Sequence, residues 1–301
     1  MPILLYADRR ASAFCSSACP RIPLFAMVRS SISRVLQGPL ALVLALLFVL
    51  AGCGGGSGGG EGAGVQIEKG ERSPSINGAA ALITAPADSA VLDSPNVSTV
   101  VEAENFETGI QTDTKRAGQI ANSSNGQHFH LILDNGPYMA NYEAGESFDL
   151  GNLEPGAHTL FAFPSRSYHE SVKSDTSYDY INFYVGEESG EFMLNLDDPA
   201  IIYSRPKGTY SGAGAERIML DFYLHNVELS SDGYKARYTI RDGNGNEVAS
   251  TTLSEWAPAF VTGLSSGTYE VNLQLLDGEG NVVPGPTNDT TREIEVKTGG
   301  A

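Results

Sequence analysis

Alternation of apolar and polar residues with a period of two most constrains the fold of this 301-residue chain. Residues 218–225, 234–241 and 268–276 alternate in this way in the second half, and residues 128–134 and 180–186 do so in the first. Successive side chains of a strand point to opposite faces of a sheet, so this period predicts strands with one face in a core. No segment beyond residue 53 shows a helical stripe. The chain is therefore predicted to be all-β, with few and short helices.

Turn residues separate these predicted strands. Asp-Gly and Asn-Gly pairs occur in residues 242–246 and 277–281, and residues 134–137 read Asp-Asn-Gly-Pro. Such pairs supply the positive φ angles of hairpin turns. Calcium binding is the alternative, but an EF-hand loop counted from Asp242 would need a glutamate at its twelfth position, where Leu253 stands. Hairpin turns are the favoured interpretation.

About 220 residues follow Asn77, enough for two small domains. Phe148-Asp-Leu-Gly-Asn-Leu-Glu-Pro-Gly156 leads into one apolar strand, and Phe260-Val-Thr-Gly-Leu-Ser-Ser-Gly267 leads into another. This turn–strand element resembles the entry to the penultimate strand in immunoglobulin-like and fibronectin-like modules of bacterial surface proteins. The resemblance implies two tandem Ig-like antiparallel β-sandwich domains, at residues 79–186 and 187–301, without the cysteine pair of antibody domains. Residues 128–164 also resemble uncharacterised bacterial secreted domains.

An uncharged apolar run of 13 residues, Leu40 to Gly52, ends directly before Cys53. The run is too short for a membrane-spanning helix, which needs about 20 apolar residues. Leu50-Ala51-Gly52-Cys53 resembles the cleavage site of a bacterial lipoprotein precursor. The resemblance implies a signal region at residues 1–52 whose true start is Met27, cleavage before Cys53, and acylation of its thiol. Gly54 in place of aspartate implies an outer-membrane lipoprotein that faces the periplasm or the cell surface.

Residues 53–78 are rich in glycine and serine and are predicted to form a flexible tether. The other cysteines, Cys15 and Cys19, lie upstream of Met27, so the mature protein is expected to have neither a disulfide nor a free thiol. A metal site at Cys15 and Cys19 is the alternative, but no further ligand lies nearby.

The chain carries 36 acidic and 19 basic residues and a formal net charge of −17. Such a charge repels phosphate backbones, so we expect no nucleic-acid partner, and the membrane contact is expected to pass through the lipidated Cys53. Solubility explains the acidity more simply than cation capture does.

The histidines carry the main chemical hypothesis. His128 and His130 are two residues apart on one predicted strand, so both side chains leave the same face from Cα atoms about 6.5–7 Å apart. His169 and Glu170, adjacent in a predicted loop, would supply the third and fourth ligands, and His158 begins another predicted strand. Nitrogen and oxygen ligands of this kind suit zinc or copper(II), and an open position would allow a catalytic zinc. The alternative is a polar sheet face whose histidines are hydrogen-bonded to neighbouring strands.

No hydrolase motif or phosphate-binding loop occurs in the sequence. The first interpretation is therefore a membrane-anchored, non-enzymatic module that binds a protein, glycan or small ligand. Arg166, Tyr168 and His169, on a loop of the first module, are candidate contacts for an anionic ligand or a glycan. The first module is also rich in aromatic residues, namely Tyr138, Tyr178, Tyr180 and Tyr184. A metal-binding protein built on His128, His130 and His169 is the second hypothesis, and a passive spacer is the third.

Overall fold

The computed structural model describes residues 64–195 and 197–299. In that part of the chain seventeen strands form four sheets, beside two one-turn helices, η1 (Lys115–Gly118) and α1 (Ala213–Glu216). The all-β prediction is therefore confirmed. The predicted signal region, Cys15, Cys19, Cys53 and the glycine-rich start of the tether lie outside the described residues.

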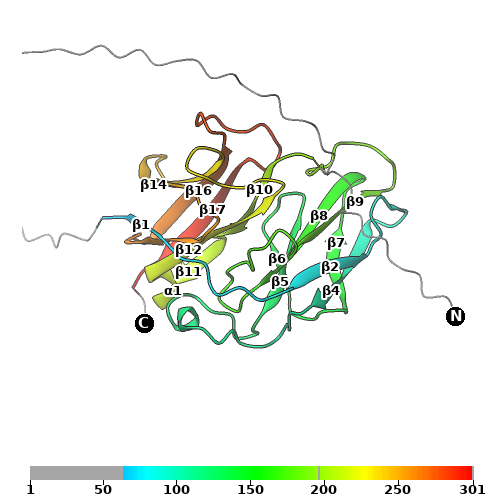
Figure 1. The fold of residues 1–301 in the computed structure, drawn as a ribbon, viewed down its shortest axis with the longest axis horizontal. Coiled ribbons are helices and arrows are strands. Elements are labelled where there is room, and N and C mark those ends of the chain that lie inside the picture. Colours follow the sequence, from blue (N-terminus) through cyan, green and yellow to red (C-terminus); the bar gives the residue numbers. More distant parts are fainter. Residues whose placement is uncertain (1–63, 196, 300–301) are drawn as a thin grey trace, which may run out of the picture. The chain divides into compact units, whose positions relative to one another are not determined.

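The first module consists of a three-stranded and a five-stranded sheet (Figure 1). The three-stranded sheet has the order β2 (Ala80–Ala85), β4 (Asn96–Glu104), β7 (Ser147–Asn152). The five-stranded sheet has the order β3 (Val91–Leu92), β9 (Asp179–Val185), β8 (Gly156–Ser165), β5 (His128–Leu133), β6 (Met139–Asn141).

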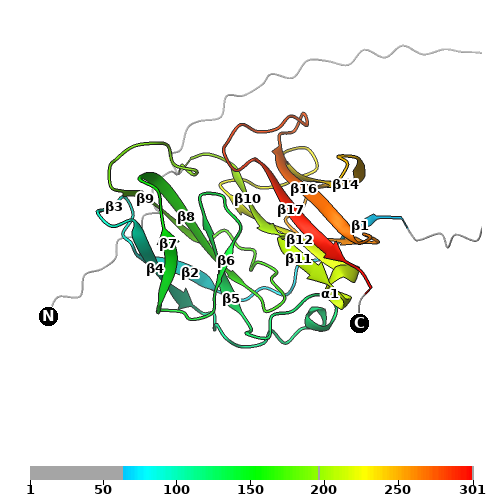
Figure 2. The same cartoon turned by 180° about the vertical axis from the view of Figure 1, so that it is seen from behind.

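The second module repeats this arrangement, as Figure 2 shows from behind. One sheet has the order β1 (Gln66–Lys69), β15 (Ala259–Thr262), β12 (Arg217–His225), β10 (Ala200–Arg205). The other has the order β11 (Gly208–Ser211), β17 (Asp289–Lys297), β16 (Gly267–Leu276), β13 (Lys235–Asp242), β14 (Glu247–Leu253).

Apart from β1, the two modules have the same strand order. The order β2-β4-β7 corresponds to β10-β12-β15, and β3-β9-β8-β5-β6 corresponds to β11-β17-β16-β13-β14. With β1 left aside, the second strand of each module along the chain lies at a sheet edge and pairs in parallel with the module's last strand. These pairs are β3–β9 and β11–β17. All other strand pairs are antiparallel. The expected pair of Ig-like sandwiches is the architecture of the described residues.

The motif that suggested the repeat has a structural role in both modules. The Tyr269 hydroxyl, near the start of β16, donates a hydrogen bond to the Ser265 carbonyl, four residues upstream, at 3.1 Å. This contact is the tyrosine corner of Ig-like folds. His158 takes the same place in β8, where its Nε2 lies 2.8 Å from the Glu154 carbonyl. Its Nδ1 lies 2.6 Å from an Asp134 carboxylate oxygen.

Each pair of sheets encloses an apolar core. The first core contains Phe129 and Leu131 of β5 together with Val97 and Val101 of β4. The second core contains Phe222 of β12 and residues from the facing sheet. These are the faces that the alternation predicts.

The opposite faces of β5 and β12 are also buried. Ile132 and Phe163 belong to the same hydrophobic cluster as the second module, and the Phe163 ring lies 4.6 Å from that of Tyr223. The two modules therefore share an apolar contact. The period-two alternation does not reveal this contact between the modules. A strand that is covered on both faces can still carry polar residues on one face if they find hydrogen-bond or ion-pair partners.

The segment from β1 to β2 corrects the predicted tether, which was expected to extend to residue 78. Residues 66–69 instead pair with β15, and Ser73 hydrogen-bonds Glu170 of the first module at 2.8 Å through its backbone NH. Arg116 contacts the same Glu170 carboxylate. Main-chain pairing and these polar contacts order a segment whose composition alone indicated a coil.

The predicted turns at Asp134 and Asp242 join antiparallel strands, β5 to β6 and β13 to β14. The Asp242 carboxylate accepts hydrogen bonds from the backbone NH groups of Asn244 and Asn246, both at 2.9 Å.

Among the described residues, no helix has the length and apolar character required to cross a bilayer.

Candidate metal centre

His128 and His130 both project from the face of β5 that is directed away from the first core. Their neighbours Phe129 and Leu131 fill that core, so the alternation of the strand places both imidazoles on the opposite side. Contact with the second module buries this side, and neither histidine is exposed to solvent. The candidate ligands therefore lie in a region of low dielectric constant.

His169 reaches the same place through a tight turn. His128 is the cross-strand partner of Ser165, the last residue of β8. The chain turns back immediately after Ser165, since the His169 NH donates to the Arg166 carbonyl at 2.7 Å and the Arg166 NH to the Glu170 carbonyl at 2.9 Å. His169 has a φ of 67° in this turn, a left-handed conformation in which histidine is enriched. The turn directs its ring to His128.

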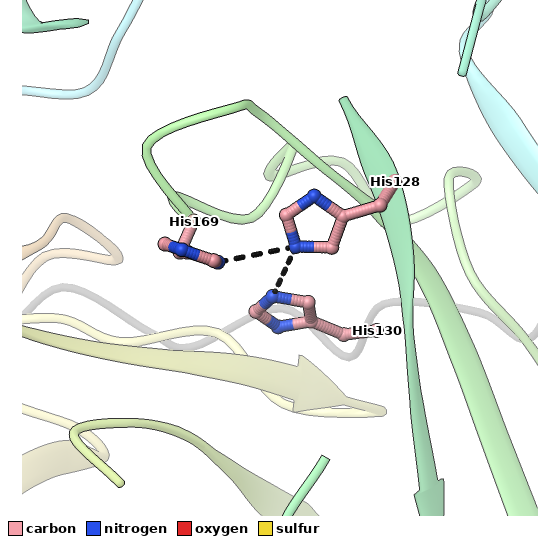
Figure 3. Close-up of side chains that lie close together, drawn as sticks. All are labelled: His128, His130 and His169. Atoms are coloured by element: carbon pink, nitrogen blue, oxygen red, sulfur yellow. Dashed lines mark hydrogen bonds between the residues drawn. The ribbon is translucent and has the colours of Figure 1, made fainter. Parts of the chain in front are cut away.

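The three imidazoles meet at His128 Nε2 (Figure 3). His130 Nε2 and His169 Nδ1 each lie 3.1 Å from that atom, and one nitrogen of each ring lies within 4.8 Å of the others. In a tetrahedral zinc centre with Zn–N bonds of ~2.0–2.1 Å, neighbouring ligand nitrogens are about 3.3 Å apart. The separations from His128 are thus close to those of ligands on one ion.

Two of the rings have a hydrogen-bond partner on their outer side. His128 Nδ1 lies 2.9 Å from the Gly126 carbonyl, which can only accept, so this nitrogen carries the proton of a neutral ring. His130 Nδ1 lies 3.1 Å from the Ser204 hydroxyl of the second module. Outer hydrogen bonds of this kind fix the tautomer and orientation of metal-binding histidines.

Burial keeps the rings neutral. Desolvation lowers the pKa of His128 to about 4, and it lowers the pKa values of His130 and His169 well below the ordinary value. The nearby cations Arg205 and Lys207 act in the same direction. Neutral imidazole is the form that binds a metal.

Without an ion, the contacts around His128 are poorly matched. Its Nε2 has a single lone pair, yet two ring nitrogens approach it at 3.1 Å. At most one of them can donate into that lone pair in good geometry. A cation between the three nitrogens would accept all three lone pairs.

Tyr138, just before β6, lies against the same cluster. Its ring stacks on that of His130 with centroids 3.6 Å apart, and its hydroxyl lies 3.3 Å from His169 Nδ1. Arg205 donates to this hydroxyl at 3.3 Å, and Lys207 Nζ lies 3.8 Å from the ring centroid. Burial raises the pKa of Tyr138 to about 12, although Arg205 opposes that shift.

Two other candidate residues lie elsewhere. The Glu170 carboxylate accepts from Ser73 and Arg116, so it is not a fourth ligand as the sequence suggested. Burial raises the pKa of Glu170, but Lys173, the Ser73 hydrogen bonds and Arg116 outweigh that effect and lower it. His158 belongs to the corner described above.

The loop contacts proposed for a glycan or an anion are also buried. Arg166 is 3% exposed and Tyr168 is fully buried, and both bond to the segment between β1 and β2. A ligand from solvent would have to displace that segment, so the expectation of an accessible loop site was wrong at these two residues.

Comparison with known proteins does not assign a family. No protein-family model matches the chain, and no curated protein matches its sequence. Fibronectin(III)-like modules of Clostridium thermocellum CbhA match 72% of this chain and 94% of their own at 12% identity, with a TM-score of 0.25. Latent PorU from Porphyromonas gingivalis matches 80% of this chain and 21% of its own at 13% identity, with a TM-score of 0.24. A tandem repeat of a large adhesion protein matches 72% and 48% at 16% identity, with a TM-score of 0.22. The fold assignment therefore rests on the strand order.

Three residues of the site could not be recognised from the sequence as neighbours of the histidines. Ser204 and Arg205 belong to β10 in the second module, and no local pattern links them to β5. Tyr138 was noted only as one of several aromatic residues. Its proximity to Asp134-Asn-Gly-Pro, a turn that folds the chain back onto β5, was the available signal.

Proposed function

We propose that the folded part of this chain is a metal-binding module built on His128, His130 and His169. The convergence of three ring nitrogens, from the fully buried His128 and His130 and the partly buried His169, carries this proposal. The Gly126 carbonyl holds the proton of the His128 ring on Nδ1, which leaves the lone pair of His128 Nε2 on the inner side. Imidazole ligands without sulfur suit zinc or copper(II).

The role we propose is non-enzymatic. The first sequence interpretation, an interaction module with a protein, glycan or small-molecule ligand, loses support where Arg166 and Tyr168 are buried. The metal hypothesis gains support from the cluster, and we place it first. If the protein takes up no metal, the interaction module and the passive spacer are the remaining hypotheses.

Metal analysis tests this proposal. The purified full-length chain, incubated with copper(II) or zinc and freed of excess ion, should retain stoichiometric metal. His130→Ala removes one of three ligands and should lower metal affinity by at least 100-fold. His158→Tyr is the matched control, because it changes a histidine outside the cluster into the residue found at the equivalent corner, Tyr269. Uptake by His130→Ala equal to that of the unsubstituted chain would refute the site.

We also propose that the module is exported and anchored to a bacterial membrane, most consistently the outer membrane, by acylation of Cys53. The support is the Leu-Ala-Gly-Cys sequence after an apolar run. Cys53→Ser should move the protein from the membrane fraction to the soluble fraction of lysed cells. Mass spectrometry of the unsubstituted protein should find a lipid on that sulfur; an unmodified Cys53 inside an uncleaved chain would contradict the proposal.

A further inference from the structure

A small cavity lies where the two modules meet. Its volume is about 10 Å³, enough for one water molecule or one monatomic ion. Two of the side chains that line it are cationic and none is anionic. Both modules contribute to its wall, with Ile120, Ala121 and Tyr168 from the first and Arg205, Tyr210 and Arg217 from the second.

Arg205, at the end of β10, is a buried cation without an ion pair. It is 7% exposed, and no carboxylate of the described residues forms an ion pair with its guanidinium. Asp221 is its cross-strand partner, but the Asp221 carboxylate binds Lys173 and the Ser171 NH. A buried charge is costly unless it is paired and hydrogen-bonded. The cavity beside Arg205 is therefore a place where a negative charge is favoured.

Arg205 and Tyr210 have donors to spare at this cavity. Arg205 donates to the Tyr210 hydroxyl from Nε at 3.2 Å and from Nη2 at 2.7 Å, and to the Tyr138 hydroxyl from Nη1 at 3.3 Å. A guanidinium has five N–H groups, so two of them lack an acceptor within the described part of the chain. The Tyr210 oxygen also accepts from the Lys207 NH at 3.2 Å, and its own O–H has no acceptor among the same residues. Tyr210 is 5% exposed, so this O–H is a buried donor.

Arg217 on β12 adds a second positive charge to the cavity wall. Its guanidinium carbon lies 3.7 Å from the centroid of the Phe260 ring, and its Nη2 lies 3.4 Å from a carboxylate oxygen of Glu68. The Glu68 side chain is 58% exposed, and a pair of this kind with water around it is weak. The positive charge of Arg217 is thus only partly offset. Salt screens the net negative charge of the whole chain over ~10 Å, so the nearby cations determine the potential in the cavity.

We propose that this cavity binds one small monovalent anion of the size of chloride. The Tyr210 O–H and the Arg205 N–H groups donate to the anion, and the charges of Arg205 and Arg217 offset its own. The volume admits a single atom rather than an anion of several atoms such as phosphate. Because both modules form the wall, the bound anion stabilises the contact between them. This inference is independent of the histidine metal site.

The dependence of unfolding on chloride tests the site. Urea unfolding of the full-length chain is measured with a chelator present, in sodium chloride and in sodium gluconate of equal ionic strength. Gluconate is too large for the cavity. A ligand that binds only the folded state stabilises it by mass action. Above the dissociation constant, each tenfold rise in chloride should therefore raise the ratio of folded to unfolded protein about tenfold relative to gluconate.

Two variants assign this effect to the cavity. Tyr210→Phe removes one donor to the anion and should lower the chloride affinity by about tenfold or more. Arg205→Met removes the buried charge and should abolish the difference between chloride and gluconate. Tyr184→Phe is the matched control, on β9 with its ring against Phe192, and should keep the full chloride effect.

Equal stability of the unsubstituted chain in chloride and in gluconate would overturn the anion site and would mean that water is the occupant. A chloride effect that remains undiminished in Tyr210→Phe would also overturn it. If Arg205→Met does not fold, Tyr210→Phe decides the question. Neither result bears on metal uptake by the histidines, which is measured separately.

Discussion

Replacing Asp221 by alanine should lower the free energy of unfolding by about 3–5 kcal/mol. Asp221 on β12 is fully buried and pairs with Lys173 of the first module, whose side chain is 3% exposed. The Asp221 carboxylate also accepts from the Ser171 NH at 3.2 Å. Removing the carboxylate leaves a buried ammonium without a counter-charge at that position, hydrogen-bonded to the Ser171 hydroxyl at 2.7 Å. Urea unfolding of the full-length chain measures the loss.

A double variant is the control for this prediction. Asp221→Leu with Lys173→Met removes both charges and keeps similar volume, so it should recover most of the lost stability. If Asp221→Ala costs less than about 1 kcal/mol, the pair is accessible to water and the contact between the modules is not closed there.

Acid should destabilise the metal-free protein well above the pH at which carboxylates titrate. The folded state keeps the pKa of His128 near 4, while the unfolded chain has an ordinary value near 6.5. Between these values the unfolded state binds the extra proton, so stability is complete above about pH 6.5 and falls as the pH decreases toward 4. The titration of His128 alone should lower the free energy of unfolding by about 2 kcal/mol at pH 5. His130 and His169 act in the same direction, since burial lowers their pKa values too.

The measurement is the melting temperature between pH 5 and 7.5, with a chelator present. In His130→Gln about one proton fewer should be taken up on unfolding. The slope of the free energy of unfolding against pH should therefore decrease by ~1.4 kcal/mol per pH unit. A melting temperature that stays constant from pH 7 to pH 5 would mean that the histidines are protonated in the folded state, and it would contradict the neutral cluster.

The strands that bear the site were predictable because their pattern is local. Residues 128–134 alternate as β5 does, and the same alternation places His128 and His130 on one face. The repeated turn–strand element likewise predicted the corners at His158 and Tyr269. The residues that determine these features, by their alternation or as turn formers, lie within a few positions of each other in the chain, so the sequence alone reveals them.

The approach of His169 to His128 was a hypothesis that the sequence could not resolve. It depends on the β5–β8 register and on a left-handed conformation at His169 itself. Both properties arise from tertiary pairing, so neither has a local signature.

The second module's contribution was not predictable. Met219, Asp221 and Tyr223 occupy the face of β12 that period two assigns as the polar one, yet all three are buried. Lys173, Phe163 and Trp256 provide the partners that make this burial favourable. The same contact brings Ser204 and Arg205 to the histidines. A single-module interpretation could not have contained these residues.

Anomalous X-ray scattering from crystals of the copper-loaded protein tests the metal centre most directly. The account predicts a copper peak within bonding distance, about 2.0–2.1 Å, of His128 Nε2, His130 Nε2 and His169 Nδ1. A copper-loaded crystal whose peaks all lie away from these three nitrogens would contradict it.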